Sequence, residues 1–242
     1  MKKFKILYIY PHPDDESFGP AAAIFDQIRD GHEVYLLTLT RGGATRQRFR
    51  LGISIGEMGE IRFNEMLKVK ETLKLTGMEV LDLPDSGLQE FDPRKLENII
   101  RDHINKIKPD IIVTYPVHGV SGFHDHLVTH AVVKRVFLEL MDSGNGYPKR
   151  LAFNTLPDKG FSPWEGDRFI LKQSTPDLID CIVKLDDEMK QAMKDSLDCY
   201  KTYKSTIEES GVIEKINDEV PFEFFNESFS PPVGKLSDEL AE

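Results

Sequence analysis

One histidine and three acidic residues lie together in the stretch PHPDDESFG, which directly follows the apolar run of residues 4–10. These side chains are His12, Asp14, Asp15 and Glu16. Adjacent aspartates repel each other, and a buried carboxylate without a partner is costly. We therefore expect a cation beside them. The alternative is that the acids only begin a helix, where negative charge interacts favourably with the helix dipole.

Four more histidines lie in the stretch HGVSGFHDHLVTH, at His118, His124, His126 and His130. Histidine and carboxylate are ligands that suit zinc, and two histidines with one carboxylate leave a position open for water. The residue types therefore predict a metal held by His12, by one of the two aspartates and by a histidine of this second stretch. The other aspartate would be free to act as a base toward water.

The elements that must position these side chains alternate along the first part of the chain. Apolar runs cover residues 4–10, 33–40, 79–83 and 110–115, and helical patterns cover residues 21–29, 57–75, 93–106 and 125–140. Glycines 31 and 77 are expected to end the first two helices. Short, continuously apolar runs are typical of strands buried on both faces of a parallel sheet. The alternation predicts an α/β fold with right-handed crossovers.

Ligands of an open α/β sheet bind beyond the carboxyl ends of the strands. The acidic loop follows the first predicted strand, TRGGATR follows the second, and the histidine loop follows the fourth. We therefore expect three segments to converge on one crevice. The arginine-rich stretch RGGATRQRFR is interpreted either as a solvated mobile loop or as a lid that recognises an anionic group.

The pattern changes after residue 143. We predict strands at residues 150–156, 168–171 and 178–184, and then a long helix at 186–203. The acidic, aromatic segment from residue 208 is interpreted as a tail that wraps the surface. We expect a single domain of residues 1–242, with a Rossmann-like core in 1–142 and an extension in 143–242.

Composition narrows the classes of partner. The formal charge of −10 and the pI of about 5.3 argue against a general affinity for nucleic acid or anionic membranes. Two cysteines make a disulfide framework improbable and fit a reducing compartment. Neither a secretion signal nor an apolar stretch of membrane-spanning length is visible. We expect a cytoplasmic protein without membrane insertion; a homo-oligomer is possible.

The stretch PHPDDESFG, with a downstream Asp-His pair, resembles the PIG-L/LmbE family of zinc-dependent N-acetylglucosaminyl deacetylases. The order of motifs agrees over roughly the first 140 residues: HPDDE after the first strand, TRG after the second, R-x-x-E in a helix and the Asp-His pair before another helix. The resemblance implies a Rossmann-like, mostly parallel sheet with helices on both faces, a Zn²⁺ cofactor and an amino-sugar substrate.

The resemblance also implies roles for individual residues. His12, Asp15 and His126 correspond to the zinc ligands, and Asp14 corresponds to the general base. Arg62 corresponds to a substrate-binding arginine, and we expect Arg41 of the arginine-rich loop to assist it. Asp125 would orient one of the histidines.

Two stretches depart from the family pattern. The family usually has G-H-P-D-H, whose first histidine stabilises the oxyanion, whereas this chain has Phe123 at that place. His124 or His118 would have to supply the missing donor, or the donor is absent. The family also often carries H-x-S-Q near the C-terminus, and the nearest counterpart is Tyr200-Lys201-Thr202-Tyr203.

Two other functions remain open from the sequence. A divalent-metal phosphoesterase could use the acidic loop, although histidines around the metal argue against magnesium. A metal-bearing relative that binds a sugar but turns it over slowly is the second alternative, because a phenyl ring cannot stabilise an oxyanion.

Overall fold

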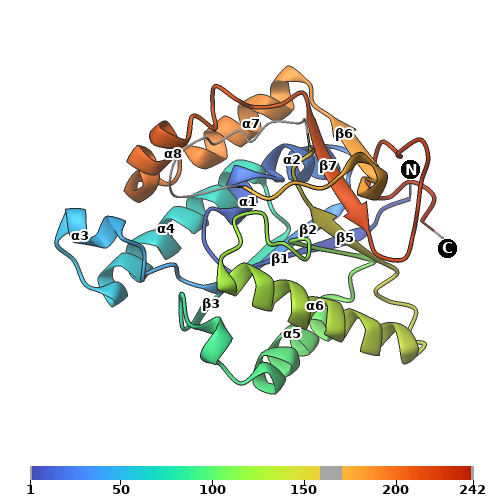
Figure 1. Ribbon diagram of the computed structural model, residues 1–242, viewed down its shortest axis with the longest axis horizontal. Coiled ribbons are helices and arrows are strands. Elements are labelled where there is room, and N and C mark those ends of the chain that lie inside the picture. Colours follow the sequence, from blue (N-terminus) through green and yellow to red (C-terminus); the bar gives the residue numbers. More distant parts are fainter. Residues whose placement is uncertain (1, 159–170, 241–242) are drawn as a thin grey trace.

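The computed structural model describes residues 2–158 and 171–240. Its centre is a seven-stranded sheet with the strand order β3-β2-β1-β4-β5-β7-β6 (Figure 1). The strands are β1 (Lys5–Tyr10), β2 (Glu33–Thr40), β3 (Gly77–Leu83), β4 (Ile111–Thr114), β5 (Arg150–Asn154), β6 (Cys181–Lys184) and β7 (Glu219–Phe224). All neighbours from β3 to β5 are parallel, whereas β7 is antiparallel to both β5 and β6. The predicted mostly parallel α/β fold is therefore confirmed.

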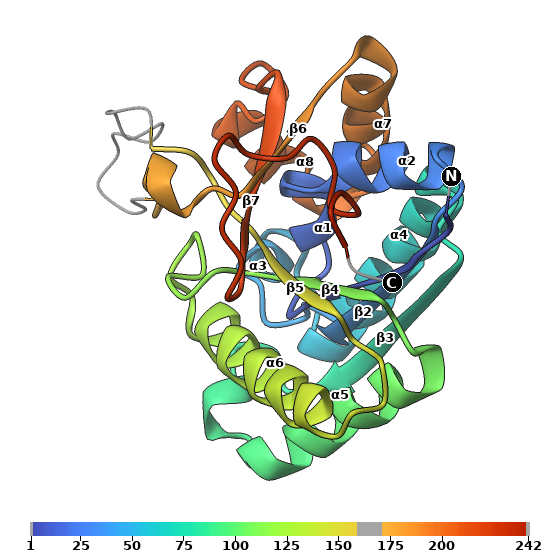
Figure 2. The same ribbon diagram turned by 90° about the vertical axis from the view of Figure 1, so that its right-hand side faces the viewer.

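Helices cover both faces of this sheet. The α-helices are α1 (Asp15–Phe18), α2 (Ala21–Arg29), α3 (Gln47–Leu51), α4 (Ile55–Leu73), α5 (Pro93–Ile107), α6 (His124–Asp142), α7 (Asp187–Leu197) and α8 (Lys204–Ser210). Short 3₁₀ turns are η1 (Leu88–Glu90), η2 (Pro176–Leu178) and η3 (Lys201–Tyr203). Figure 2 shows α5 and α6 on one face, and α2, α4 and α7 on the other.

The central strand β1 explains why the sheet has two cores. Ile6, Tyr8 and Tyr10 point to the face covered by α2, α4 and α7, and Leu7 and Ile9 point to the face covered by α5 and α6. All five side chains are fully buried. Side chains alternate between the two faces of a strand, so a continuous apolar run is what a strand needs when both faces are covered.

Of the two predicted helix stops, one is confirmed and one is wrong. Gly31 follows α2 with a φ of +87°, as expected for a helix stop. Asp92 caps α5, and Pro93 takes its first position. The helix predicted to run from residue 57 to 75 instead begins earlier, because Ser54 and Glu57 form a capping box. It ends at Leu73, and the predicted stop, glycine 77, is the first residue of β3.

The C-terminal part differs most from the prediction. The segment interpreted as a surface tail contains β7, which lies between β5 and β6, and Phe222 and Phe224 on it belong to the core. Pro221 hides this strand in the sequence, because proline inside a run argues against a central strand. The predicted strand 178–184 is shortened to β6, and the predicted helix 186–203 ends at Leu197. The strand predicted at 168–171 lies almost wholly outside the described residues.

Arg150 at the start of β5 ties the C-terminal segment to the sheet. Its side chain is fully buried, and its Nε and Nη2 donate to the carboxylate of Glu227 at 2.8 and 2.6 Å. Its Nη1 donates to the carbonyl oxygens of Leu236 and Asp238 at 2.5 and 2.8 Å. The guanidinium also lies over the ring of Phe224, 4.2 Å from its centroid. The division of the chain into a core of residues 1–142 and an extension of 143–242 stays a prediction. The strands of the second part, β5, β7 and β6, continue the same sheet beyond β4.

We expect Arg150→Met to lower the free energy of unfolding by about 3–5 kcal/mol, because it leaves Glu227 and two carbonyl groups without their donor. Urea denaturation followed by circular dichroism measures this change. Arg135→Met is the matched control, since Arg135 is 62% exposed and pairs with Glu97 and Glu139 at the surface. The control should lose no more than about 1 kcal/mol. Equal losses in the two variants would contradict the proposed anchoring role.

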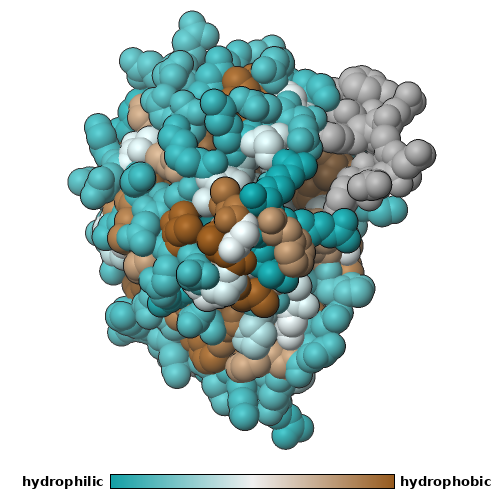
Figure 3. Space-filling model, turned by 90° about the vertical axis from the view of Figure 1, so that its left-hand side faces the viewer, coloured by the Kyte–Doolittle hydropathy of each residue, from teal (hydrophilic) through white to brown (hydrophobic). Residues whose placement is uncertain are grey.

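One surface beside the sheet edge is unusually apolar. Helix α3 has no buried residue, and Phe49, Leu51 and Ile55 are 65%, 53% and 53% exposed. Figure 3 shows apolar side chains gathered at the centre of the face that carries α3 and α4, with hydrophilic ones around them.

No helix within residues 2–158 and 171–240 has the length and apolar character needed to cross a membrane.

Candidate metal centre

The loop after β1 folds back on itself so that its acids point inward. The backbone N–H of His12 donates to Asp15 Oδ2 at 2.8 Å, and the N–H groups of Ser17 and Phe18 donate to the carbonyl of Asp14. Asp14 has a φ of +87°, in the left-handed region that aspartate tolerates better than most residues. Asp14 and Asp15 therefore diverge, which allows the two adjacent carboxylates to have different neighbours.

Asp15 lies between two histidines, His12 from the loop after β1 and His126 from the first turn of α6. Asp15 Oδ2 is 3.6 Å from His12 Nδ1, and Asp15 Oδ1 is 3.5 Å from His126 Nε2. One ligand atom of each residue lies within 4.8 Å of the others. Two atoms bound tetrahedrally at about 2.0–2.1 Å from one zinc ion are roughly 3.3 Å apart. These three residues therefore have the spacing of a metal-ligand group.

Hydrogen bonds orient both imidazoles toward this group. His126 Nδ1 is 2.9 Å from the carbonyl oxygen of Gly119, which can only accept, so Nδ1 carries the proton and Nε2 is left with its lone pair. His12 Nε2 is 3.1 Å from Asp125 Oδ2, so the proton lies on Nε2 and Nδ1 is free. In each case the nitrogen that can bind a metal is the one that faces Asp15.

The charges around the group also fit a cation. Burial lowers the pKa of His126, which keeps the imidazole neutral as a metal ligand must be. Burial also acts to lower the pKa of His12, but the hydrogen bond with Asp125 and the charges of Asp15 and Asp85 outweigh it and raise the pKa. The surroundings of His12 thus carry an excess of negative charge, which a bound divalent ion would offset.

Tyr115 supports two of the three residues, a role that its sequence position does not reveal. Its hydroxyl donates to Asp15 Oδ1 at 2.6 Å, and its ring stacks on His126 at a centroid distance of 4.2 Å and an interplanar angle of 10°. Tyr115 itself is buried. Groups that hold metal ligands in this way typically affect metal affinity about 10–100-fold.

Asp85 is a further acid at the site that the sequence analysis missed. His12, Asp85 and Asp125 form a second group whose ligand atoms lie close together. However, the carboxylate of Asp125 already accepts the N–H groups of Ser86 and Leu88 at 2.8 and 3.1 Å. Asp85 accepts a backbone N–H as well, at 2.6 Å. We therefore interpret this second group as the support of His12. The available signal was that Asp85, too, directly follows a strand end.

Asp14 faces Arg62 rather than the histidines. Arg62 Nη2 donates to Asp14 Oδ2 at 2.6 Å and to the carbonyl of Pro13 at 2.7 Å, and Nη1 donates to the carbonyl of Gly42 at 3.2 Å. Burial raises the pKa of Asp14 to about 7, although the charge of Arg62 opposes this shift. A carboxylate with a pKa near neutrality is suited to accept and release a proton at physiological pH.

The two arginines expected to bind substrate are both engaged within the protein. Arg62 is only 2% exposed and lies behind Asp14, so its present contacts are those of a support for the carboxylate. Arg41 is partly exposed, pairs with Glu60 and Asp82, and lies over the ring of Phe63 at 5.1 Å. Substrate binding by either arginine stays a prediction.

The residues expected at the oxyanion position lie on the loop before α6 and at its start. Phe123 is 47% exposed and packs edge-on against His126, and His124 is exposed. His118 is half-buried: its Nδ1 accepts the N–H of Val120 at 3.1 Å, and its Nε2 lies 3.2 Å from Ser174 Oγ. His118 therefore carries its proton on Nε2.

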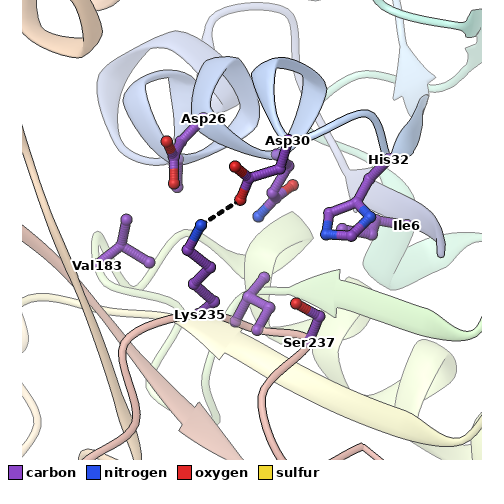
Figure 4. Close-up of a pocket in the computed structure, with 10 residues that line it drawn as sticks. Ile6, Asp26, Asp30, His32, Val183, Lys235 and Ser237 are labelled. Carbon is purple, nitrogen blue, oxygen red and sulfur yellow. Dashed lines mark hydrogen bonds and ion pairs between the residues drawn. The ribbon is translucent and has the colours of Figure 1, made fainter. Parts of the chain in front are cut away.

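A pocket at the opposite end of the sheet is separate from this centre. Figure 4 shows Asp26, Asp30, His32 and Lys235 around it, and Lys235 pairs with Asp30. His32 Nδ1 accepts the N–H of Phe4 at 3.2 Å. Asp26 and Asp30 come from the C-terminal end of α2, His32 from the turn before β2 and Lys235 from the C-terminal segment, whereas the metal group lies beyond the carboxyl ends of the strands.

Two curated relatives resemble the chain over part of their length. The mycothiol S-conjugate amidase of Streptomyces coelicolor is 29% identical over 61% of this chain and 56% of the relative. The N-acetylglucosaminyl-phosphatidylinositol de-N-acetylase of Bos taurus is 27% identical over 56% of this chain and 51% of the relative. The chain thus spans about half the length of these relatives.

Solved structures share the fold. A deacetylase triple mutant (Orf2*T) from teicoplanin biosynthesis has a TM-score of 0.69 and 16% identity, over 93% of this chain and 100% of its own. The zinc-inhibited form of teicoplanin deacetylase Orf2 has a TM-score of 0.67 and 14% identity over the same shares. At these identities the likeness concerns the fold alone.

The family assignment rests on a match to a family model. The family model PIG-L, described as GlcNAc-PI de-N-acetylase, matches residues 7–137. This range contains most of β1, all of β2 to β4, and His12, Asp14, Asp15 and His126. Because the match covers more than half of the 242 residues, the chain belongs to the PIG-L family.

Proposed function

We propose that this chain is a zinc-dependent hydrolase that removes the acetyl group from an N-acetylated amino sugar, of the N-acetylglucosamine type, or from its conjugate. The observation that carries the proposal is the separation of two adjacent carboxylates: Asp15 faces two oriented histidines, whereas Asp14 is held by Arg62. A hydrolase needs both a metal ligand and a base at one site. The names of the curated relatives, an amidase and a de-N-acetylase, support the same reaction.

In the proposed reaction, Asp14 accepts a proton from the attacking water and later returns it to the leaving amine. A pKa of about 7 for this carboxyl suits both transfers. Zinc, when bound by His12, Asp15 and His126, would polarise the amide carbonyl and acidify the water. Tyr115 and Asp125 hold these ligands in place, and Arg62 holds the base.

The donor set favours zinc over magnesium, because two of its three members are imidazoles and magnesium prefers oxygen ligands. The comparisons lend no support to a phosphoesterase, since the relatives named above break amide bonds. Phe123 is still the reason to consider a slow sugar-binding relative. The amino-sugar substrate and the cytoplasmic location stay predictions.

The test is a deacetylation assay on the purified, zinc-loaded full chain with a panel of N-acetylated sugars and their conjugates. Release of acetate that is lost after chelation and restored by zinc would support the proposal. The absence of acetate from every substrate, together with zinc-dependent release of phosphate from phosphate esters, would contradict it in favour of the phosphoesterase.

We propose His118 as the donor that replaces the missing oxyanion histidine. The N–H of Val120 fixes its tautomer, so Nε2 carries a proton that a neutral imidazole can donate. That proton faces Ser174 Oγ at 3.2 Å, so the imidazole would exchange this partner for the oxyanion. Burial lowers the pKa of His118, which favours this neutral form. His118 precedes Gly119 in the sequence, and the carbonyl of Gly119 orients the metal-ligand candidate His126.

His118→Ala should lower kcat by about 10²–10³-fold with zinc retained, the usual effect of removing an oxyanion donor. His124→Ala is the comparison, because His124 is the other candidate and is exposed. Steady-state kinetics with metal analysis would decide between them. A large loss in His124→Ala alone would transfer the role to His124. Full turnover in both variants would contradict a histidine donor, and a gain in Phe123→His would then show that the donor is missing.

A further inference from the structure

The Tyr200-Lys201-Thr202-Tyr203 turn packs against the acidic loop after β1, which carries Asp14, Asp15 and Glu16. In the chain, Tyr200 and Glu16 are 184 residues apart. Tyr200 Oη donates to Glu16 Oε1 at 2.7 Å. Thr202 donates to both oxygens of Glu65, from its N–H at 2.8 Å and from its hydroxyl at 2.6 Å. Family resemblance did not assign a function to this turn, and the proposed mechanism does not use it.

Tyr203 contacts Arg62, the residue that holds the proposed base Asp14. Its ring centroid lies 4.0 Å from the guanidinium carbon of Arg62, and its hydroxyl donates to Thr45 Oγ1 at 2.7 Å. At this distance the ring face attracts the cation, and the planar guanidinium can stack on it. The ring of Tyr200 is farther away, at 6.0 Å.

The other contacts of Arg62 leave its position dependent on that ring. Its two terminal nitrogens donate to Asp14 and Pro13 in the loop after β1 and to Gly42 in the loop after β2. Its Nε has no hydrogen-bond partner within the described residues. The guanidinium is therefore bound through its Nη atoms to the loops after β1 and β2, and Tyr203 supports its plane.

We propose that Tyr203 is a positioning residue for Asp14, acting through Arg62; this rests on the proposed function of Asp14 as the base. The carboxylate of Asp14 accepts a hydrogen bond of 2.6 Å from Arg62 Nη2, so its direction depends on where that guanidinium lies. If Arg62 tilts, the carboxylate follows it away from the attacking water. A displacement of about 1 Å at a reacting group can cost about 10²-fold in rate.

Thr202 provides the matched control, because it lies in the same turn but bonds to Glu65 rather than to Arg62. Thr202→Val removes one hydrogen bond of the turn and should keep kcat close to that of the wild type. Tyr203→Phe keeps the ring and loses only the hydroxyl, so it should also keep kcat. Tyr203→Leu removes the ring and should lower kcat about 10- to 100-fold, with KM and zinc content unchanged.

A measurement that does not depend on turnover completes the test. In ¹H–¹⁵N spectra of the guanidinium groups, the hindered Nη signals of Arg62 should average in Tyr203→Leu and stay resolved in Tyr203→Phe and Thr202→Val. Wild-type kcat and unchanged Arg62 signals in Tyr203→Leu would overturn the proposal, as would equal losses of kcat in Tyr203→Leu and Thr202→Val.

Two further outcomes separate this proposal from the proposed function. If the wild type deacetylates no sugar but the Arg62 signals respond to Tyr203→Leu, the positioning holds and the proposed function fails. If Tyr203→Leu does not fold, Arg62→Lys tests the other partner, because lysine keeps the charge but lacks the planar group that stacks. A wild-type kcat in Arg62→Lys would overturn the proposal, and a loss comparable to that expected for Tyr203→Leu would support it.

Discussion

His126→Ala should yield a folded protein that neither retains zinc nor releases acetate. The variant loses one of the two imidazoles in the proposed ligand group and leaves Asp15 facing only His12. Even changes to the partners of ligands weaken metal binding about 10–100-fold, so the loss of a ligand should exceed this. Metal analysis after dialysis and an acetate-release assay measure the two effects. His12→Ala should behave in the same way.

His130→Ala is the control for His126→Ala. His130 lies one turn further along α6, is also buried, and its Nδ1 lies 2.9 Å from the carbonyl of Tyr115. It belongs to neither group of possible metal ligands among the described residues. This variant should retain zinc even if it is less stable. Full zinc occupancy in His126→Ala, or equal zinc loss in both variants, would show that the ligand assignment is wrong.

The convergence of the loops could be predicted because the three segments follow strands of one parallel sheet, whose carboxyl ends lie at the same edge. β1 pairs with β2 on one side and with β4 on the other, so the loops that follow these strands meet at one edge of the sheet. Continuous apolar runs identify such strands without any knowledge of contacts. His12 and His126 could therefore be expected near each other, although the residues alone could not choose between Asp14 and Asp15.

Tyr115 and Tyr200 could not be predicted as supporting residues, because their contacts bridge long separations in the chain. Tyr115 and Asp15 are 100 residues apart, and Tyr200 and Glu16 are 184 apart. A tyrosine in an apolar run has the same local pattern whether it packs in the core or donates to a catalytic carboxylate. Only the folded sheet decides which of the two occurs.

The error at β7 has a different origin. The strand follows an acidic segment and contains Pro221, and both features reduce the strand signal. What makes it a strand is the open edge of β5, to which it pairs as an antiparallel neighbour, with β6 on its other side. Such pairing reflects the need to cover a sheet edge, and this need is not visible in the local sequence.

Asp14→Asn should retain zinc and lose activity by about 10²-fold or more, the usual effect of removing a proton-transfer group. The amide oxygen can still accept a hydrogen bond from Arg62, so the loop should keep its shape, but the amide cannot take a proton from water. Metal analysis and kcat of the zinc-loaded variant measure the two effects separately.

Asp15→Asn is the informative partner of Asp14→Asn, because the two residues are adjacent and the substitution is identical. Asp15 faces both histidines, so its variant should lose zinc together with activity. The opposite pattern, with zinc lost in Asp14→Asn and activity kept in Asp15→Asn, would reverse the two roles. Arg62 contacts Asp14 but not Asp15. A reversal of the two roles would therefore pair the buried guanidinium with a metal ligand instead of with the base.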